Sequence, residues 1–209
     1  MFDTATLAAY LLTAAVLVFI PGPGTAWIVA QSAAGGTSRG VQAAFGLETA
    51  TLIHSLAAGL GLSALLATSA MAFEVLKYAG AAYLIWLGIK AWRGNAPEQS
   101  SEATVAPVVS AREVYLRSVM TGVLNPKVAL FFLAFLPQFV HPERGMVWLQ
   151  FLILGALLSM IGMLNSLMLS FAVGRFGRRF KGSGGRWKER LTGSVFIALG
   201  LRLAIQQRS

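Results

Sequence analysis

Cysteine is absent from this 209-residue chain, and charged side chains are scarce, at 12% of all residues. Without cysteine the chain forms neither a disulfide nor a thiolate-ligated metal site. Its two histidines, His54 and His141, stand far apart in the sequence. We therefore expect no metal site and no cofactor. A soluble domain carries charge on roughly a quarter of its residues, so the shortage of charge argues against a surface that faces water.

Apolar residues are abundant instead, with a hydrophobic fraction of 56% and a mean hydropathy of +0.67. Long apolar runs separated by short polar stretches are typical of a polytopic membrane protein. The net charge of +9 suggests a nucleic-acid binder as an alternative. The basic residues, however, lie almost entirely between the apolar runs, where membrane proteins carry them in cytoplasmic loops. We therefore expect contact with membrane lipid and none with nucleic acid.

The apolar runs predict an all-α fold with about six transmembrane helices, because a span needs about 20 apolar residues. No Lys or Arg precedes the first run, so we expect it to stay in place and not to be cleaved as a signal peptide. The polar, Pro- and Ser-containing stretch 93–113 is the one clear linker. It separates a first three-helix half, 1–92, from a second, 114–209. The six segments are 4–34, 41–70, 73–92, 114–140, 146–173 and 191–205.

The distribution of basic residues predicts the orientation in the membrane. With six spans, most of the 17 Lys and Arg residues fall on the face opposite the N-terminus, including the dense stretch 175–190. Positively charged loops stay in the cytoplasm. We therefore expect both termini outside and the central linker in the cytoplasm of a cell whose inner membrane holds the protein. This argument would fail with a count of five spans.

Three spans in each half mean that the halves insert in opposite orientations. Each half also opens with a segment that contains an embedded proline motif. The motifs are Pro21-Gly22-Pro23-Gly24 in the first half and Asn125-Pro126-Lys127 in the second.

Prolines at membrane depth interrupt helices. Interrupted helices at matching positions of two inverted halves indicate the midplane binding site of a secondary transporter. The alternative interpretation is that these prolines only kink the helices for packing.

Three ionisable residues that lie away from the ends of the apolar segments are candidate site residues. Lys127 precedes an apolar run, where a lysine must be paired, be hydrated or reach the interface. Glu48 is the one carboxylate at such a position and is therefore the candidate partner of Lys127. His54 falls on another face of the same segment; it either carries protons or forms a structural hydrogen bond. The amides of Gln31, Gln138 and Asn165 either line a polar cavity or bond between helices.

Three further observations are blocks of sequence that run in order along the chain. They are Phe19-Ile20-Pro21-Gly22-Pro23-Gly24, Gly80-Ala81-Ala82-Tyr83-Leu84-Ile85-Trp86-Leu87-Gly88 and Asn125-Pro126-Lys127-Val128-Ala129-Leu130-Phe131-Phe132-Leu133-Ala134-Phe135-Leu136-Pro137-Gln138-Phe139-Val140. Together these blocks resemble the LysE/RhtB family of amino-acid exporters, and the similarity runs through nearly the whole chain. The resemblance implies a small inner-membrane protein that exports amino acids or close derivatives, driven by the proton gradient. It also implies that Pro21, Gly22 and Pro23 of the first proline motif, and the three residues of the second, are site residues.

The chain departs from the pattern of this family at three positions. Gly24 stands where many members have Asn or Asp, Glu48 where the residue is usually small or apolar, and Ala50 where it is often Gly. Two hypotheses follow: the extra acid compensates for the missing polar side chain, or it favours a cationic substrate. A passive channel, an exporter of another solute, and a membrane-embedded enzyme or assembly factor remain as alternatives. A homodimer is compatible with so small a transporter.

Overall fold

The computed structural model is all-helical over the residues that it describes. These are 2–68 and 110–176, together with residues 71, 75, 78–79, 81–82, 85–86, 89, 92–93, 194, 197–198 and 201. Most of the predicted linker, much of the third segment and most of the last segment lie outside the described residues. The basic stretch 175–190 lies outside them from residue 177 onward. The division into two three-helix halves therefore stays a prediction.

The first segment is broken where the prolines predict it. Helix α1 (Thr4–Phe19) begins at Asp3, whose side chain accepts a hydrogen bond from the Thr6 N–H. It ends before Pro21, and α2 (Pro23–Thr68) begins two residues later. The interruption is local because each proline lacks the N–H that would continue the helical hydrogen bonds.

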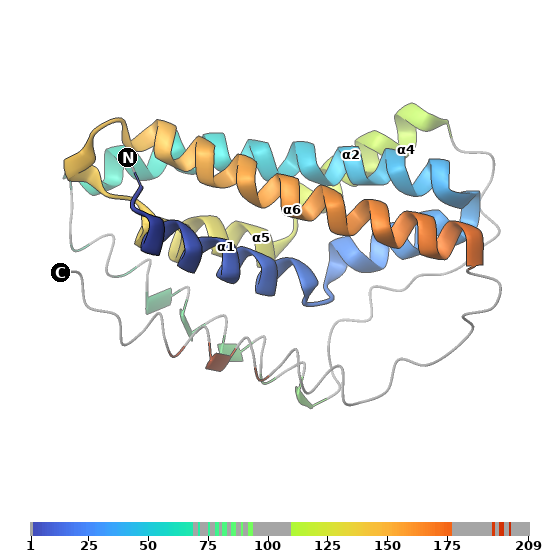
Figure 1. Ribbon diagram of the computed structural model, residues 1–209, viewed down its shortest axis with the longest axis horizontal. Helices are drawn as coiled ribbons and strands as arrows, with labels where there is room; N and C mark the ends of the chain where they lie inside the picture. Colours follow the sequence, from blue (N-terminus) through green and yellow to red (C-terminus); the bar gives the residue numbers. More distant parts are fainter. Residues whose placement is uncertain are drawn as a thin grey trace.

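Helix α2 contains a second interruption, at Gly35 and Gly36. Gly36 has φ +75°, a left-handed conformation that glycine adopts without strain. In Figure 1 the chain reverses direction at this point, so residues 23–34 continue the line of α1 and residues 37–68 return beside it. The sequence predicted a turn over residues 35–40, but the turn is confined to the two glycines and the helix resumes at Thr37.

The second half opens with a bent pair of helices. Helix α4 (Ala111–Val123) is followed by the short α5 (Pro126–Leu130), a π-helical turn η1 (Phe131–Phe135) and a 3-10 turn η2 (Leu136–Phe139). The two parts of this segment meet at 47°. After the short η3 (Pro142–Arg144), helix α6 (Val147–Phe176) runs back along the bundle (Figure 1).

Helix α6 packs on both α1 and α2, and α2 also packs along α4. The apolar core lies between α1, the aromatic run of η1 and η2, and the first half of α6. The Tyr10 hydroxyl donates a hydrogen bond to the Leu154 carbonyl across this core. The buried residues of this apolar core are Tyr10, Ala14, Leu17, Ala58, Phe131, Phe132, Phe135, Leu136, Phe139, Val140, Phe151, Leu154 and Leu158.

The outer surface of the described helices is apolar in many places. Leu12 is 70% exposed, Leu60 68% and Met168 66%. Two described helical stretches, Pro23–Gly61 and Val147–Arg175, are long and apolar enough to cross a membrane. The bent pair of Ala111–Val123 and Pro126–Phe139 is a third candidate if its two parts together form a single span. Exposed leucine and methionine on such helices are what lipid contact requires.

Candidate functional site

The two proline-containing breaks lie next to each other in the bundle. The connection is direct: the Lys127 Nζ donates a hydrogen bond of 2.7 Å to the Ile20 carbonyl. Ile20 caps the C-terminal end of α1, and Lys127 belongs to the first turn of α5. The structure thus brings together the two motifs that the sequence separates by about half the chain.

Lys127 is buried and is held at the first break by one hydrogen bond. The side chain is only 8% exposed, and a buried ammonium requires hydrogen-bond partners or a favourable dipole. The Ile20 carbonyl supplies the first, and the negative end of the α1 dipole supplies the second. Gly22 makes room for the lysine, because a Cβ on Gly22 would lie 3.3 Å from Lys127 Cδ and 3.6 Å from its Nζ.

Asn125 shapes the second break. Its side-chain oxygen accepts a 3.1 Å hydrogen bond from the Lys127 N–H and so caps α5. Pro126 occupies the first helical position, where its missing N–H leaves no bond unmade. The break is therefore built from residues with strong local preferences, and this is why the sequence revealed it.

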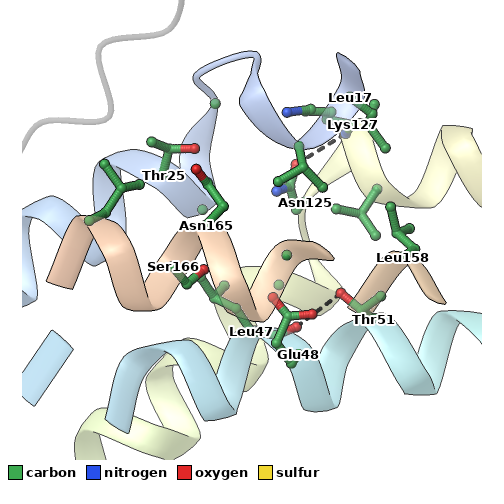
Figure 2. A pocket seen from close by; sticks show the side chains of 17 residues that line it. Leu17, Thr25, Leu47, Glu48, Thr51, Asn125, Lys127, Leu158, Asn165 and Ser166 are labelled. Atoms are coloured by element: carbon green, nitrogen blue, oxygen red, sulfur yellow. Dashed lines mark hydrogen bonds between the residues drawn. The ribbon is translucent and has the colours of Figure 1, made fainter. Parts of the chain in front are cut away.

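A cavity of about 100 Å³ opens where the breaks meet (Figure 2). This volume holds several water molecules. Helices α1, α2, α4, α5 and α6 all contribute to its wall. The lining residues are Leu17, Val18, Gly22, Gly24, Thr25, Leu47, Glu48, Thr51, Gly122, Asn125, Lys127, Val128, Leu158, Gly162, Asn165, Ser166 and Leu169.

Glu48 faces Lys127 across this cavity but does not pair with it. Figure 2 shows the two side chains on opposite sides, and the ion pairs of the described residues do not include them. The predicted pairing is therefore wrong in this conformation. The physical reason is competition: Lys127 is turned to the Ile20 carbonyl, while Glu48 extends from α2 toward α6.

Glycine on α6 accommodates the carboxylate of Glu48. A Cβ on Gly162 would lie 2.6 Å from Glu48 Oε1 and 3.0 Å from Oε2. Glu48 is only 8% exposed; the Ser159 side chain on α6 is a hydrogen-bonding neighbour of its carboxylate, and the ion pairs of the described residues do not include it. The Glu48 side chain also lines the cavity.

The other candidate residues divide into two groups. Gly22, Gly24, Asn125 and Lys127 line the cavity with Glu48, whereas the rings of Pro21, Pro23 and Pro126 do not and act through the backbone. His54 also lies outside the lining. Its Nε2 is 3.4 Å from the Gly122 carbonyl, and its ring stacks on Phe132 at 5.9 Å. His54 thus has the contacts of a structural histidine.

The sequence indicated some of the polar residues that line the cavity and missed others. Asn165 was one of three amides proposed for a polar cavity, and it does line this one. Gln31 instead accepts a hydrogen bond from Arg39, and Gln138 donates to the Ala134 carbonyl. Thr51 and Ser166 were missed, although Thr51 stands one helical turn after Glu48 and Ser166 directly follows Asn165. For Thr51 the available signal was the helical spacing of three residues.

A family model described as LysE type translocator matches residues 15–207. The chain belongs to this family. A homoserine/homoserine lactone efflux protein of Salmonella typhimurium is 35% identical over 94% of each chain. A leucine efflux protein of Enterobacter sp. (strain 638) is 30% identical over 93% of each chain. An uncharacterized membrane protein of Vibrio cholerae is 35% identical over 94% of this chain and 95% of its own length. No solved structure matches.

Membership in the LysE type translocator family confirms the resemblance found in the sequence. It makes the chain a member of a translocator family with amino-acid efflux proteins among its relatives. The apolar helices and the membrane-protein relative agree with a location in the membrane.

Proposed function

We propose that the protein exports amino acids or close derivatives across the cytoplasmic membrane, by proton antiport, with the cavity at the two helix breaks as its binding site. One observation carries the proposal: a buried base and a buried acid, Lys127 and Glu48, face each other across a cavity where two broken helices meet. Broken helices are where secondary transporters build substrate sites. The names of two relatives, for homoserine and leucine efflux, support the substrate class.

The lining of the cavity fits the chemistry of an amino acid. Lys127 has two further N–H donors beyond its bond to Ile20, and these suit a substrate carboxylate. Glu48 suits the substrate ammonium. Apolar residues such as Leu17 and Leu158 line the same space and suit an aliphatic part of the substrate.

The proposal includes an orientation. Both termini would face outward, as the charge distribution predicts. The interrupted backbone at residues 20–22 and 124–125 would allow the segments on either side to tilt and open the cavity to each face in turn.

Efflux from cells tests the proposal. Cells that express the protein are loaded with radiolabelled L-leucine, L-homoserine or other amino acids, and the loss of label is followed. We expect faster efflux of one or a few amino acids, and we expect Lys127→Ala to remove this gain. Arg117→Ala is the matched control, because Arg117 is an exposed cation on α4 that pairs with Glu113 and does not line the cavity.

Two results would contradict the proposal. One is unchanged efflux in Lys127→Ala at equal expression in the membrane. The other is the absence of efflux for every amino acid tested despite verified expression.

A further inference from the structure

The two titratable side chains that line the cavity differ in how they are held. Lys127 is fixed, because its Nζ bonds to the Ile20 carbonyl at the C-terminal end of α1. Glu48 is buried to the same extent, yet its carboxylate has only a neutral hydrogen-bonding neighbour, Ser159, and no cation paired with it among the described residues. The carbonyl oxygens at a helix C-terminus favour a nearby ammonium group. The Glu48 carboxylate has no comparable charged partner among the described residues, and burial disfavours an anion that no cation accompanies.

A buried carboxyl group without a paired cation has two stable states. It is neutral when it holds a proton, and it is stable as an anion when a cation enters beside it. Neutral hydroxyl and amide groups, such as those of Ser159 beside the carboxyl and of Thr51, Asn165 and Ser166 in the lining, are able to hydrogen-bond to either state. Gly162 leaves the carboxyl room on its far side. The site is therefore suited to exchange a proton for an ammonium group.

Other charged groups lie elsewhere on the surrounding helices. On α4, Glu113 and Arg117 pair with each other, and on α6 the last turn carries Arg175. At the start of α1, Asp3 pairs with Arg144. On α2 itself, Arg39 bonds to Gln31 and His54 lies against Phe132. Of the titratable groups described, Lys127 is the one that shares the cavity with Glu48.

We infer that the Glu48 carboxyl group exchanges one proton for the α-ammonium group of a neutral amino acid, whose carboxylate binds Lys127; this rests on the export function proposed above. The substrate enters from the cytoplasm as a zwitterion, and the proton of Glu48 leaves to the cytoplasm as the ammonium pairs with the carboxylate. When the substrate leaves on the outer side, a proton from that side returns to Glu48. One proton moves inward for each amino acid that moves outward.

The same arrangement selects the class of substrate. The described residues of the lining include one acid and one base, and a zwitterion uses both. A cationic amino acid would bring a second ammonium group for which these described residues have no second acid, so its side chain would be buried uncompensated. Of the two hypotheses for the acid at position 48, the cavity thus disfavours a cationic substrate.

Proton release on binding tests the inference. The purified full-length protein is placed in weakly buffered detergent solution with a pH indicator near neutral pH. L-leucine, L-homoserine or L-lysine is added, and calorimetry measures binding in parallel. We expect the wild type to release about one proton per bound leucine or homoserine and to bind lysine at least about tenfold more weakly. Glu48→Gln should bind more weakly and release none.

Two further variants keep the test informative if Glu48→Gln folds poorly. Glu48→Asp keeps the carboxyl group, so release should persist. Gly162→Ala should displace the carboxylate, because its new Cβ would fall 2.6 Å from Oε1, and should weaken binding. Arg117→Ala should match the wild type.

The possible failures are distinguishable. If leucine or homoserine binds and is exported but no proton is released, or if Glu48→Gln releases as many protons as the wild type, the inference is wrong and the export function stands. Binding of lysine as tight as that of leucine would overturn the substrate class. If neither leucine nor homoserine binds and no amino acid leaves cells, the export function fails as well.

Discussion

Gly22 and Gly24 stand two positions apart in the first break, but they face different neighbours. A Cβ on Gly22 would lie 3.3 Å from Lys127 Cδ, which is tighter than usual, whereas a Cβ on Gly24 would lie at an ordinary 3.5 Å from Leu47 Cδ1. We expect Gly22→Ala to shift Lys127 and to lower amino-acid efflux several-fold, and Gly24→Ala to remain close to the wild type. Efflux from cells at matched expression measures both. Equal losses in the two variants would contradict this account of Gly22.

Asn125 acts at the second break as the cap of α5. Its side chain accepts the Lys127 N–H, and loss of such a cap costs about 1 kcal/mol. We expect Asn125→Ala to lower the melting temperature and Asn125→Asp, which keeps the accepting oxygen, to lower it less. Thermal unfolding in detergent measures both. A lower stability for the aspartate variant would mean that the amide does more than cap the helix.

At the scale of helices, the contact between α2 and α4 depends on small residues. A Cβ on Gly46 would fall 2.5 Å from the Tyr115 carbonyl oxygen, and one on Gly122 would fall 2.5 Å from Ala50 Cβ. We expect Gly46→Ala and Gly122→Ala each to destabilise the protein by about 1–3 kcal/mol. Gly61→Ala is the control, because nothing lies within 4 Å of its Cβ position. Melting temperatures that rank Gly61→Ala lowest would contradict this packing.

The helix breaks could be predicted from the sequence because their causes are local. Pro21, Pro23 and Pro126 remove backbone donors wherever they stand, and the breaks lie at these residues. The π-helical turn before Pro137 was not predicted. There the Leu136 N–H bonds to the Phe131 carbonyl, five residues back, in the turn directly before a residue that lacks an N–H. How a helix accommodates a proline depends on its packing as well as on the proline.

The sequence indicated which residues form the site but not all of the contacts between them. Proline motifs and intramembrane charge indicated Gly22, Gly24, Glu48, Asn125 and Lys127, and the structure places these five around one cavity. The supposed ion pair of Glu48 and Lys127 failed because the sequence does not show that the Ile20 carbonyl lies within reach of the lysine. Such contacts depend on how helices from the two halves are placed relative to each other.

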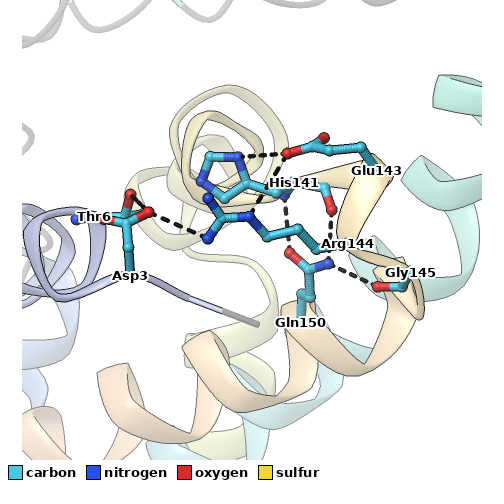
Figure 3. A network of polar contacts seen from close by, with 7 residues as sticks. All are labelled: Asp3, Thr6, His141, Glu143, Arg144, Gly145 and Gln150. Atoms are coloured by element: carbon cyan, nitrogen blue, oxygen red, sulfur yellow. Dashed lines mark hydrogen bonds and ion pairs between the residues drawn. The ribbon is translucent and has the colours of Figure 1, made fainter.

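At the scale of the whole molecule, a polar network joins the beginning of α1 to the loop before α6 (Figure 3). Arg144 pairs with Asp3 at 3.2 Å, and His141 Nδ1 lies 3.1 Å from a Glu143 oxygen. Gln150 holds the loop through bonds to the backbone of His141 and Gly145. The network thus connects the N-terminal segment to the second part of the chain, away from the cavity.

The network predicts a dependence of stability on pH. Hydrogen bonds from the backbone N–H and hydroxyl of Thr6, and from Arg144, lower the pKa of Asp3 from 3.8 to about 2. A lowered pKa means that the ionised form is favoured on folding, so the contribution is complete above the unfolded value and is lost as the pH falls toward about 2. Between pH 3.8 and about pH 2, we expect the melting temperature of the wild type to fall by more than that of Asp3→Asn. Parallel curves would contradict a role for the charge.

The central claim is that an amino acid leaves through the cavity at the helix breaks in exchange for a proton. Purified protein in proteoliposomes, loaded with labelled L-leucine or L-homoserine, tests it most directly. The account predicts that acidifying the outside accelerates efflux, that an ionophore abolishing the pH gradient removes the acceleration, and that Lys127→Ala and Glu48→Gln lack it. Efflux that is equally fast with and without the gradient would indicate a passive channel and would contradict the account.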